Sequence, residues 1–124
     1  EHIMPQKWQQ HWGFDVLPCI DDQGVELSGN DAEIARTAAI YEIGNMTLLP
    51  SRLNKDLKNF AFEDKVNGCQ LRKRWQKGMK DQTAFMITKE VTNREPLIWR
   101  EADIKERTQM LFKEFCEIWP ACSR

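Results

Sequence analysis

Four residues have side chains that could act together in a hydrolysis. Glu1 and His2 are adjacent, and Asn45 and Asn54 stand nine residues apart. A histidine with an ordinary pKa of about 6.5 can take a proton from water near neutral pH, and carboxylate and amide oxygens suit Mg²⁺ or Mn²⁺. Hydrolysis of a phosphodiester needs such a base and such a cation, because the attacking water must lose a proton and the charge developing on the phosphate must be stabilised. Because Glu1 is the only acidic residue among these four, they favour a site for one divalent ion over a site for two.

Each of these residues also has a purely structural interpretation. A lone histidine such as His2 is more often structural or exposed than catalytic. Asn45 follows Gly44 and could be a turn residue, and Asn54 could be a helix cap. The surrounding sequence has to decide between the two interpretations.

Two segments around these residues resemble the HNH, or His-Me finger, nucleases, in which a two-stranded ribbon and a following helix clamp one divalent metal. EHIMPQ at residues 1–6 is similar to the first ribbon strand, and GNMTLL at residues 44–49 is similar to the second. The resemblance implies that Glu1 is a metal ligand and that His2 is the general base. It also implies that Asn45 fixes the loop between the strands and that Asn54, early on the helix, is the second ligand. The candidate catalytic residues are therefore His2 and Asn45, and the candidate ligands of one Mg²⁺ or Mn²⁺ are Glu1 and Asn54.

Four sequence blocks point to one family within these nucleases: EHIMPQ, IGNMTLLPSRLN, NFAFEDK and IKERTQMLFKEFCEIWP. In this order they resemble the C-terminal domain of GmrSD-type modification-dependent restriction enzymes, over nearly the whole chain. The resemblance implies a metal-dependent endonuclease domain that hydrolyses DNA in the restriction of modified phage or foreign DNA. It also implies an upstream nucleotide-using domain in the same protein, so we expect residues 1–124 to be a single domain from the C-terminal part of a longer chain. The alternative is a DNA-binding or partner-docking module that has the same fold without turnover.

Composition is consistent with one folded domain. The 124 residues are 41% hydrophobic and 30% charged, and no apolar run approaches the roughly 20 residues that a membrane span requires. With no leader segment either, we expect no membrane association and a cytoplasmic location. The four cysteines lack metal-ligand or disulfide spacing and are expected to be reduced thiols.

Charge is distributed unevenly along the chain. Residues 1–50 carry a net charge of −6, residues 51–80 carry +6, and residues 81–124 carry −1. Phosphate contacts dominate the affinity of proteins for nucleic acids, so the basic middle segment is a candidate DNA contact. The alternative is a solvated helical face. The residues expected to contact DNA are Arg52, Lys55, Lys58 and Lys65.

The pattern of elements predicts an α+β fold that is mostly helical and built around a small ribbon-plus-helix core. We expect an antiparallel ribbon from residues 1–4 and 45–49, an irregular excursion over 13–29, a helix starting near Asn54, and a helix over 101–119 that Pro120 ends. A further helix is expected from Asn30 or Asp31 to Gly44, with apolar positions at Ile34, Ala35, Ala38, Ala39 and Tyr41. We expect Arg107 to form an ion pair or hydrogen bond, and the five tryptophans to lie in the core: Trp8, Trp12, Trp75, Trp99 and Trp119.

Overall fold

The computed structural model describes residues 1–82 and 85–119 and has the α+β fold that the sequence predicts, with roughly half of the chain helical. The helical elements are α1 (Gly29–Ile40), the 3-10 turn η1 (Ile43–Asn45), α2 (Ser51–Leu57), α3 (Phe62–Asn67), α4 (Met79–Gln82), α5 (Met86–Thr92) and α6 (Glu101–Ile118). A two-stranded antiparallel sheet consists of β1 (Gly68–Gln70) and β2 (Trp75–Lys77). No helix within the described residues is long and apolar enough to cross a membrane.

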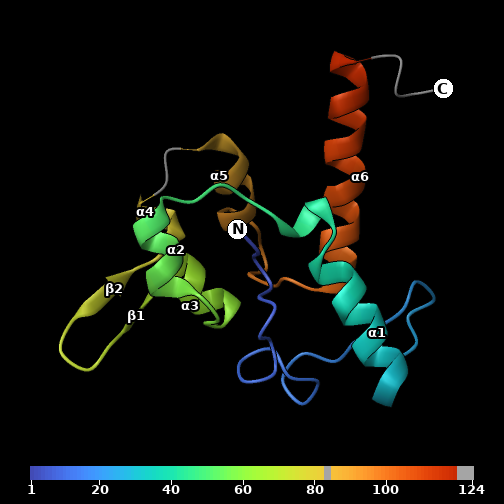
Figure 1. Ribbon diagram of the computed structural model, residues 1–124, viewed down its shortest axis with the longest axis horizontal. Helices are drawn as coiled ribbons and strands as arrows, with labels where there is room; N and C mark the ends of the chain where they lie inside the picture. Colours follow the sequence, from blue (N-terminus) through green and yellow to red (C-terminus); the bar gives the residue numbers. More distant parts are fainter. Residues whose placement is uncertain (83–84, 120–124) are drawn as a thin grey trace.

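The elements form two groups on either side of the N-terminal segment (Figure 1). Helices α1 and α6 pack against each other in one group. Helices α2, α3 and α4 and the β1–β2 hairpin form the other, with the hairpin at the outer edge. Residues 1–8 run between the two groups, so side chains at the N-terminus can lie next to α2.

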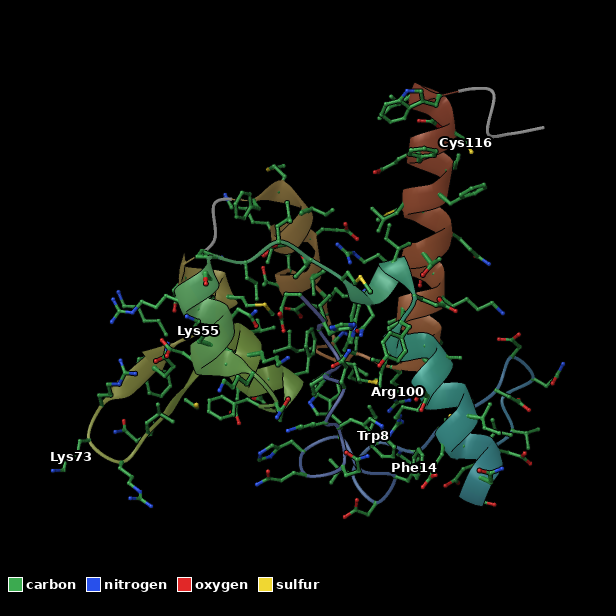
Figure 2. The ribbon with its side chains drawn as sticks, viewed as in Figure 1. Trp8, Phe14, Lys55, Lys73, Arg100 and Cys116 are labelled. Carbon is green, nitrogen blue, oxygen red and sulfur yellow. The ribbon has the colours of Figure 1, made fainter. Side chains whose placement is uncertain are left out.

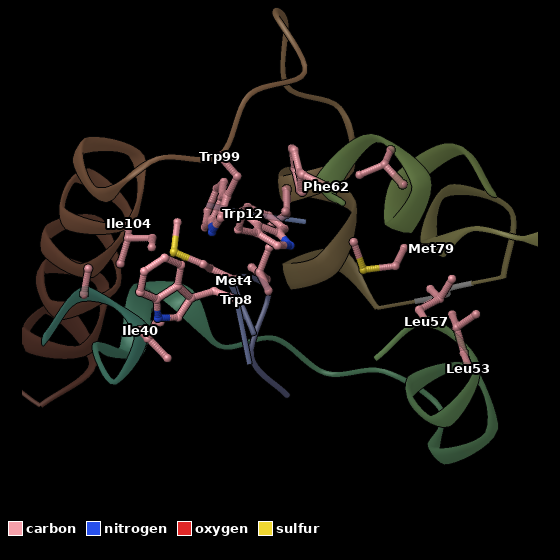
Figure 3. Close-up of a cluster of buried hydrophobic side chains, with 14 residues drawn as sticks. Met4, Trp8, Trp12, Ile40, Leu53, Leu57, Phe62, Met79, Trp99 and Ile104 are labelled. Carbon is pink, nitrogen blue, oxygen red and sulfur yellow. The ribbon is translucent and has the colours of Figure 1, made fainter. Parts of the chain in front are cut away.

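The hydrophobic core joins the two groups (Figure 3). Trp12 and Trp99 both contact the ring of Phe62, with ring centroids 6.2 and 5.7 Å apart. Trp8, Trp12 and Trp99 are buried, as predicted. The prediction is wrong for Trp75 and Trp119, which are 55% and 56% exposed, because one lies on the hairpin and the other follows the last turn of α6.

The predicted ribbon is present only as a single antiparallel bridge between His2 and Met46. The amide of Ile3 donates to the carbonyl of Asn45 (2.7 Å), and the amide of Thr47 donates to the carbonyl of Glu1 (2.9 Å). The pairing is short because Pro5 has no amide hydrogen and the 3-10 turn η1 precedes Met46. The regular sheet lies instead at β1–β2, a hairpin that the sequence does not predict because its strands have only three residues each.

The predicted helices are present, but the boundaries of two of them differ from the prediction. Helix α1 ends at Ile40 rather than at Gly44, and the predicted apolar positions Ile34 and Tyr41 are exposed. Its buried face carries Arg36, whose guanidinium donates to two carbonyls of the irregular N-terminal region and pairs with Glu101. Asn54 lies within α2 rather than at its start. Helix α6 matches the predicted range, while Pro120 lies outside the described residues.

Candidate active site

Asn45 fixes the backbone next to His2 through its side-chain amide. Its Oδ1 accepts hydrogen bonds from the amide of Met4 (2.8 Å) and from Nε1 of Trp99 (3.0 Å). Its Nδ2 donates to the carbonyls of Met4 (2.8 Å) and Ile40 (2.9 Å). Asn45 is fully buried and all four bonds are internal, so this residue positions the N-terminal segment and does not face the pocket described below.

Helix α6 holds the other side of the turn that contains Asn45. The amide of Gly44 donates to Oγ1 of Thr108, and a Cβ atom on residue 44 would overlap Thr108 and the carbonyl of Ile104. The buried guanidinium of Arg107 donates to the carbonyls of Gly44 (2.8 Å) and Met46 (2.6 Å). Gly44 is therefore required for close packing against α6, and Arg107 makes the hydrogen bonds that the sequence predicts.

Glu1, His2 and Asn54 line one small pocket between the N-terminal segment and α2. The cavity has a volume of about 10 Å³, which is close to the requirement of a single water molecule. The cavity therefore has room for about one water molecule or one ion without its hydration shell. Its walls also include Lys58 from the end of α2 and Lys65 from α3.

The environment of His2 favours the neutral imidazole. Burial lowers the pKa of His2 below 6.5, and the nearby Glu1 carboxylate opposes this shift only in part. The Nε2 atom is enclosed and has no hydrogen-bond partner in the part of the chain that the structure describes. The ring also makes an edge contact with Tyr41, with centroids 5.8 Å apart. The lowered pKa thus favours the neutral form of His2 near neutral pH.

Lys65 lies inside the molecule and not on its surface. Its Nζ donates to the carbonyls of Ile3 (2.7 Å) and His2 (3.3 Å), and the residue is 3% exposed. Burial lowers the pKa of Lys65 to about 8. Lys65 therefore ties α3 to the segment that carries His2. The sequence signal for this role is its position between the apolar residues Phe62 and Val66 on the buried face of a helix.

The other three basic residues predicted to contact DNA lie on or beside α2. Arg52 and Lys55 lie on the helix, and Lys58 is its C-terminal cap. All three are exposed, and Lys55 lies on the same side of the molecule as Lys73 of the hairpin turn (Figure 2). Since α2 also carries Asn54, these cations lie on the same short helix as a pocket residue.

The donor groups of the pocket are of the kind that a hard divalent ion prefers. Glu1 offers a carboxylate and Asn54 an amide oxygen. Residues 1–82 and 85–119 contain no cluster of three or more His, Cys, Asp or Glu side chains that could hold a metal by themselves. With only these two protein ligands, Mg²⁺ would need waters and substrate phosphate oxygens to complete its coordination, and these would have to lie outside the cavity, which has room for about one water.

Residues 1–114 match the family model described as "GmrSD restriction endonucleases, C-terminal domain". The chain belongs to this family. Membership confirms the resemblance carried by the four sequence blocks and identifies a nuclease-related restriction domain. Searches of curated proteins and of solved structures gave no match.

Proposed function

We propose that this domain is a metal-dependent endonuclease that hydrolyses DNA phosphodiester bonds at the pocket formed by Glu1, His2 and Asn54. The observation that carries the proposal is that these three residues, from two distant segments, line one small pocket. Membership of the restriction endonuclease family supports a DNA substrate and a role in restricting modified or foreign DNA. We also propose, from the sequence resemblance, an upstream nucleotide-using domain of the same protein as a partner and a cytoplasmic location.

In the proposed reaction, His2 is the general base. Its Nε2 accepts a proton from the water that attacks the phosphorus, and the low pKa of His2 keeps this nitrogen available near neutral pH. A well-placed base of this kind contributes about 10²- to 10⁴-fold to the rate.

Glu1 and Asn54 would hold one Mg²⁺ or Mn²⁺. Such an ion supplies positive charge that stabilises the transition state and the leaving oxygen. Asn45, Arg107 and Lys65 act indirectly, by fixing the backbone on which His2 is placed. Arg52, Lys55 and Lys58 are exposed beside the pocket and would contact the phosphates on either side of the cleaved bond.

The proposal is tested by incubating supercoiled plasmid with the chain in Mg²⁺, in Mn²⁺ and in chelator. We expect nicked or linear DNA with the metals and intact plasmid with chelator. Cleavage that persists in chelator would contradict the metal dependence. Absence of cleavage in every condition, with the full-length protein as well as this chain, would favour the binding module without turnover.

A further inference from the structure

The β1–β2 hairpin presents one face to the body of the molecule and the other to solvent. In its register, Gln70 pairs with Trp75, Cys69 with Gln76, and Gly68 with Lys77. Gln76 is 4% exposed, whereas its neighbours Trp75 and Lys77 are exposed. Successive strand residues point to opposite faces, so Trp75 and Lys77 share the outward face.

The outward face combines an open indole with a glycine beneath it. A Cβ atom on residue 68 would stand 3.2 Å from Cζ2 of Trp75, so the indole lies close over Gly68. Trp75 is 55% exposed and forms no aromatic pair with any residue that the structure describes. The hairpin thus holds a large aromatic surface in solvent, although burying it would be favourable.

The turn that precedes this indole in the sequence is rich in cations. The turn that links the strands is closed by a bond from the amide of Leu71 to the carbonyl of Arg74 (2.8 Å), and it carries Arg72, Lys73 and Arg74. Lys73 stands at the tip, farthest from the body (Figure 2). Between Asp64 and Asp81 the sequence has no acidic residue, and none of the turn cations pairs with a carboxylate of the described residues.

We infer that the outward face of this hairpin binds a single-stranded or locally unpaired segment of nucleic acid. One base stacks on Trp75, and the phosphates on either side contact Arg72, Lys73, Arg74 and Lys77. The inference rests on the proposed function, which identifies the nucleic acid as DNA. It adds that the DNA bound by the hairpin is single-stranded or locally unpaired. Exposed aromatics beside cations are the feature that nonspecific single-strand binding proteins share, and the face of a base is accessible only when the base leaves its stack.

The test measures the affinity of the full chain for a short oligothymidylate and for a duplex by fluorescence anisotropy, in chelator. Trp75→Leu retains an apolar side chain over Gly68 but has no π face, whereas Trp75→Phe retains both. We expect Trp75→Leu to weaken oligothymidylate binding about 5- to 150-fold, Trp75→Phe to weaken it much less, and duplex binding to change little. Trp119→Leu should leave both affinities unchanged, because this equally exposed tryptophan caps α6, on the other side of the fold from the hairpin (Figure 1).

The turn gives a second measurement that leaves the indole intact. In the variant with Arg72, Lys73 and Arg74 all changed to Gln, the salt dependence of oligothymidylate binding should become shallower by about 0.7 for each phosphate that the variant no longer neutralises. Equal binding by Trp75→Leu and Trp75→Phe, or an unchanged salt slope in the turn variant, would overturn the inference. The inference would also be overturned if the parent chain is a dimer and Trp75→Leu dissociates it without changing the affinity for oligothymidylate. In that case a second copy of the chain would cover the indole.

Because binding is measured without metal, its result is separate from that of cleavage. A chain that binds through Trp75 and never cleaves would contradict the proposed nuclease activity and support the hairpin assignment. A chain that cleaves in a metal-dependent way, with affinity independent of Trp75, would support the nuclease and overturn the assignment.

Discussion

Asn45→Ala should be among the most destabilising single substitutions in this domain. The change removes the amide that bonds to the backbone of Met4, to the carbonyl of Ile40 and to the indole of Trp99. These three residues are at most 2% exposed, so water cannot readily replace the missing amide. Leaving a buried polar group unsatisfied costs about 1 to 3 kcal/mol. At the low end of that range for each of the four bonds, the free energy of unfolding falls by about 4 kcal/mol.

Urea denaturation followed by tryptophan fluorescence measures this decrease. With an m-value of about 2 kcal/mol/M, the midpoint should fall by about 2 M, and a domain of ordinary stability would be close to unfolding without denaturant. Asn30→Ala is the matched control, because Asn30 is exposed and its side chain makes no hydrogen bond with the described residues. Its effect should stay within about 0.5 kcal/mol. An Asn45→Ala variant whose free energy of unfolding falls by less than about 1 kcal/mol would refute the role assigned to the amide.

Three further predictions concern the pocket and its surroundings. Asn54→Ala should raise the Mg²⁺ concentration for half-maximal cleavage about tenfold, if this ligand contributes about 1.4 kcal/mol, and an unchanged metal titration would exclude it as a ligand. Because the pKa of Lys65 is about 8 in the folded chain and 10.5 in its reference state, the unfolded chain binds more protons between these values. The free energy of unfolding should therefore rise with pH across that interval, by up to about 3 kcal/mol relative to Lys65→Met, and parallel stability curves would contradict the burial of this amine. Changing Arg52, Lys55 and Lys58 to Gln should reduce the salt slope of duplex binding by about 0.9 for each phosphate that is no longer neutralised, with little change in stability, and an identical slope would indicate a solvated face.

The parts of the fold that local sequence determines are predictable. Helix α6 has acidic residues in its first turn and a repeating apolar stripe, and its observed range agrees with the prediction. The β1–β2 hairpin is not predictable, because its placement depends on tertiary packing: Gln76 turns inward, and a Cβ at Gly68 or Gly78 would overlap the neighbouring backbone. Three residues of strand carry too little periodicity to reveal such close approaches.

The candidate site also has features that the sequence predicts and features that only the tertiary structure reveals. The convergence of Glu1, His2 and Asn54 follows from the family resemblance, since the long separation between His2 and Asn54 carries no information about their distance. The net charge of the segment groups Lys65 with the surface lysines, because a charge count does not distinguish the two faces of a helix, although the spacing with Phe62 and Val66 places Lys65 on the apolar face. Only the folded chain reveals that its ammonium group is held by the carbonyls of His2 and Ile3.

The most direct test of the nuclease centre compares the two histidines of the chain as cleavage catalysts. His2 lines the pocket with an uncommitted Nε2, whereas His11 packs edge-on against Phe60 and does not line the pocket. In a plasmid assay with Mg²⁺ or Mn²⁺, His2→Ala should lower the cleavage rate about 10²- to 10⁴-fold and leave DNA affinity largely intact, because a base acts on the nucleophile and contributes little to ground-state binding. His11→Ala should cleave like the parent. Unchanged turnover in His2→Ala, or an equal decrease in the two variants, would contradict the assignment of this pocket as the nuclease centre.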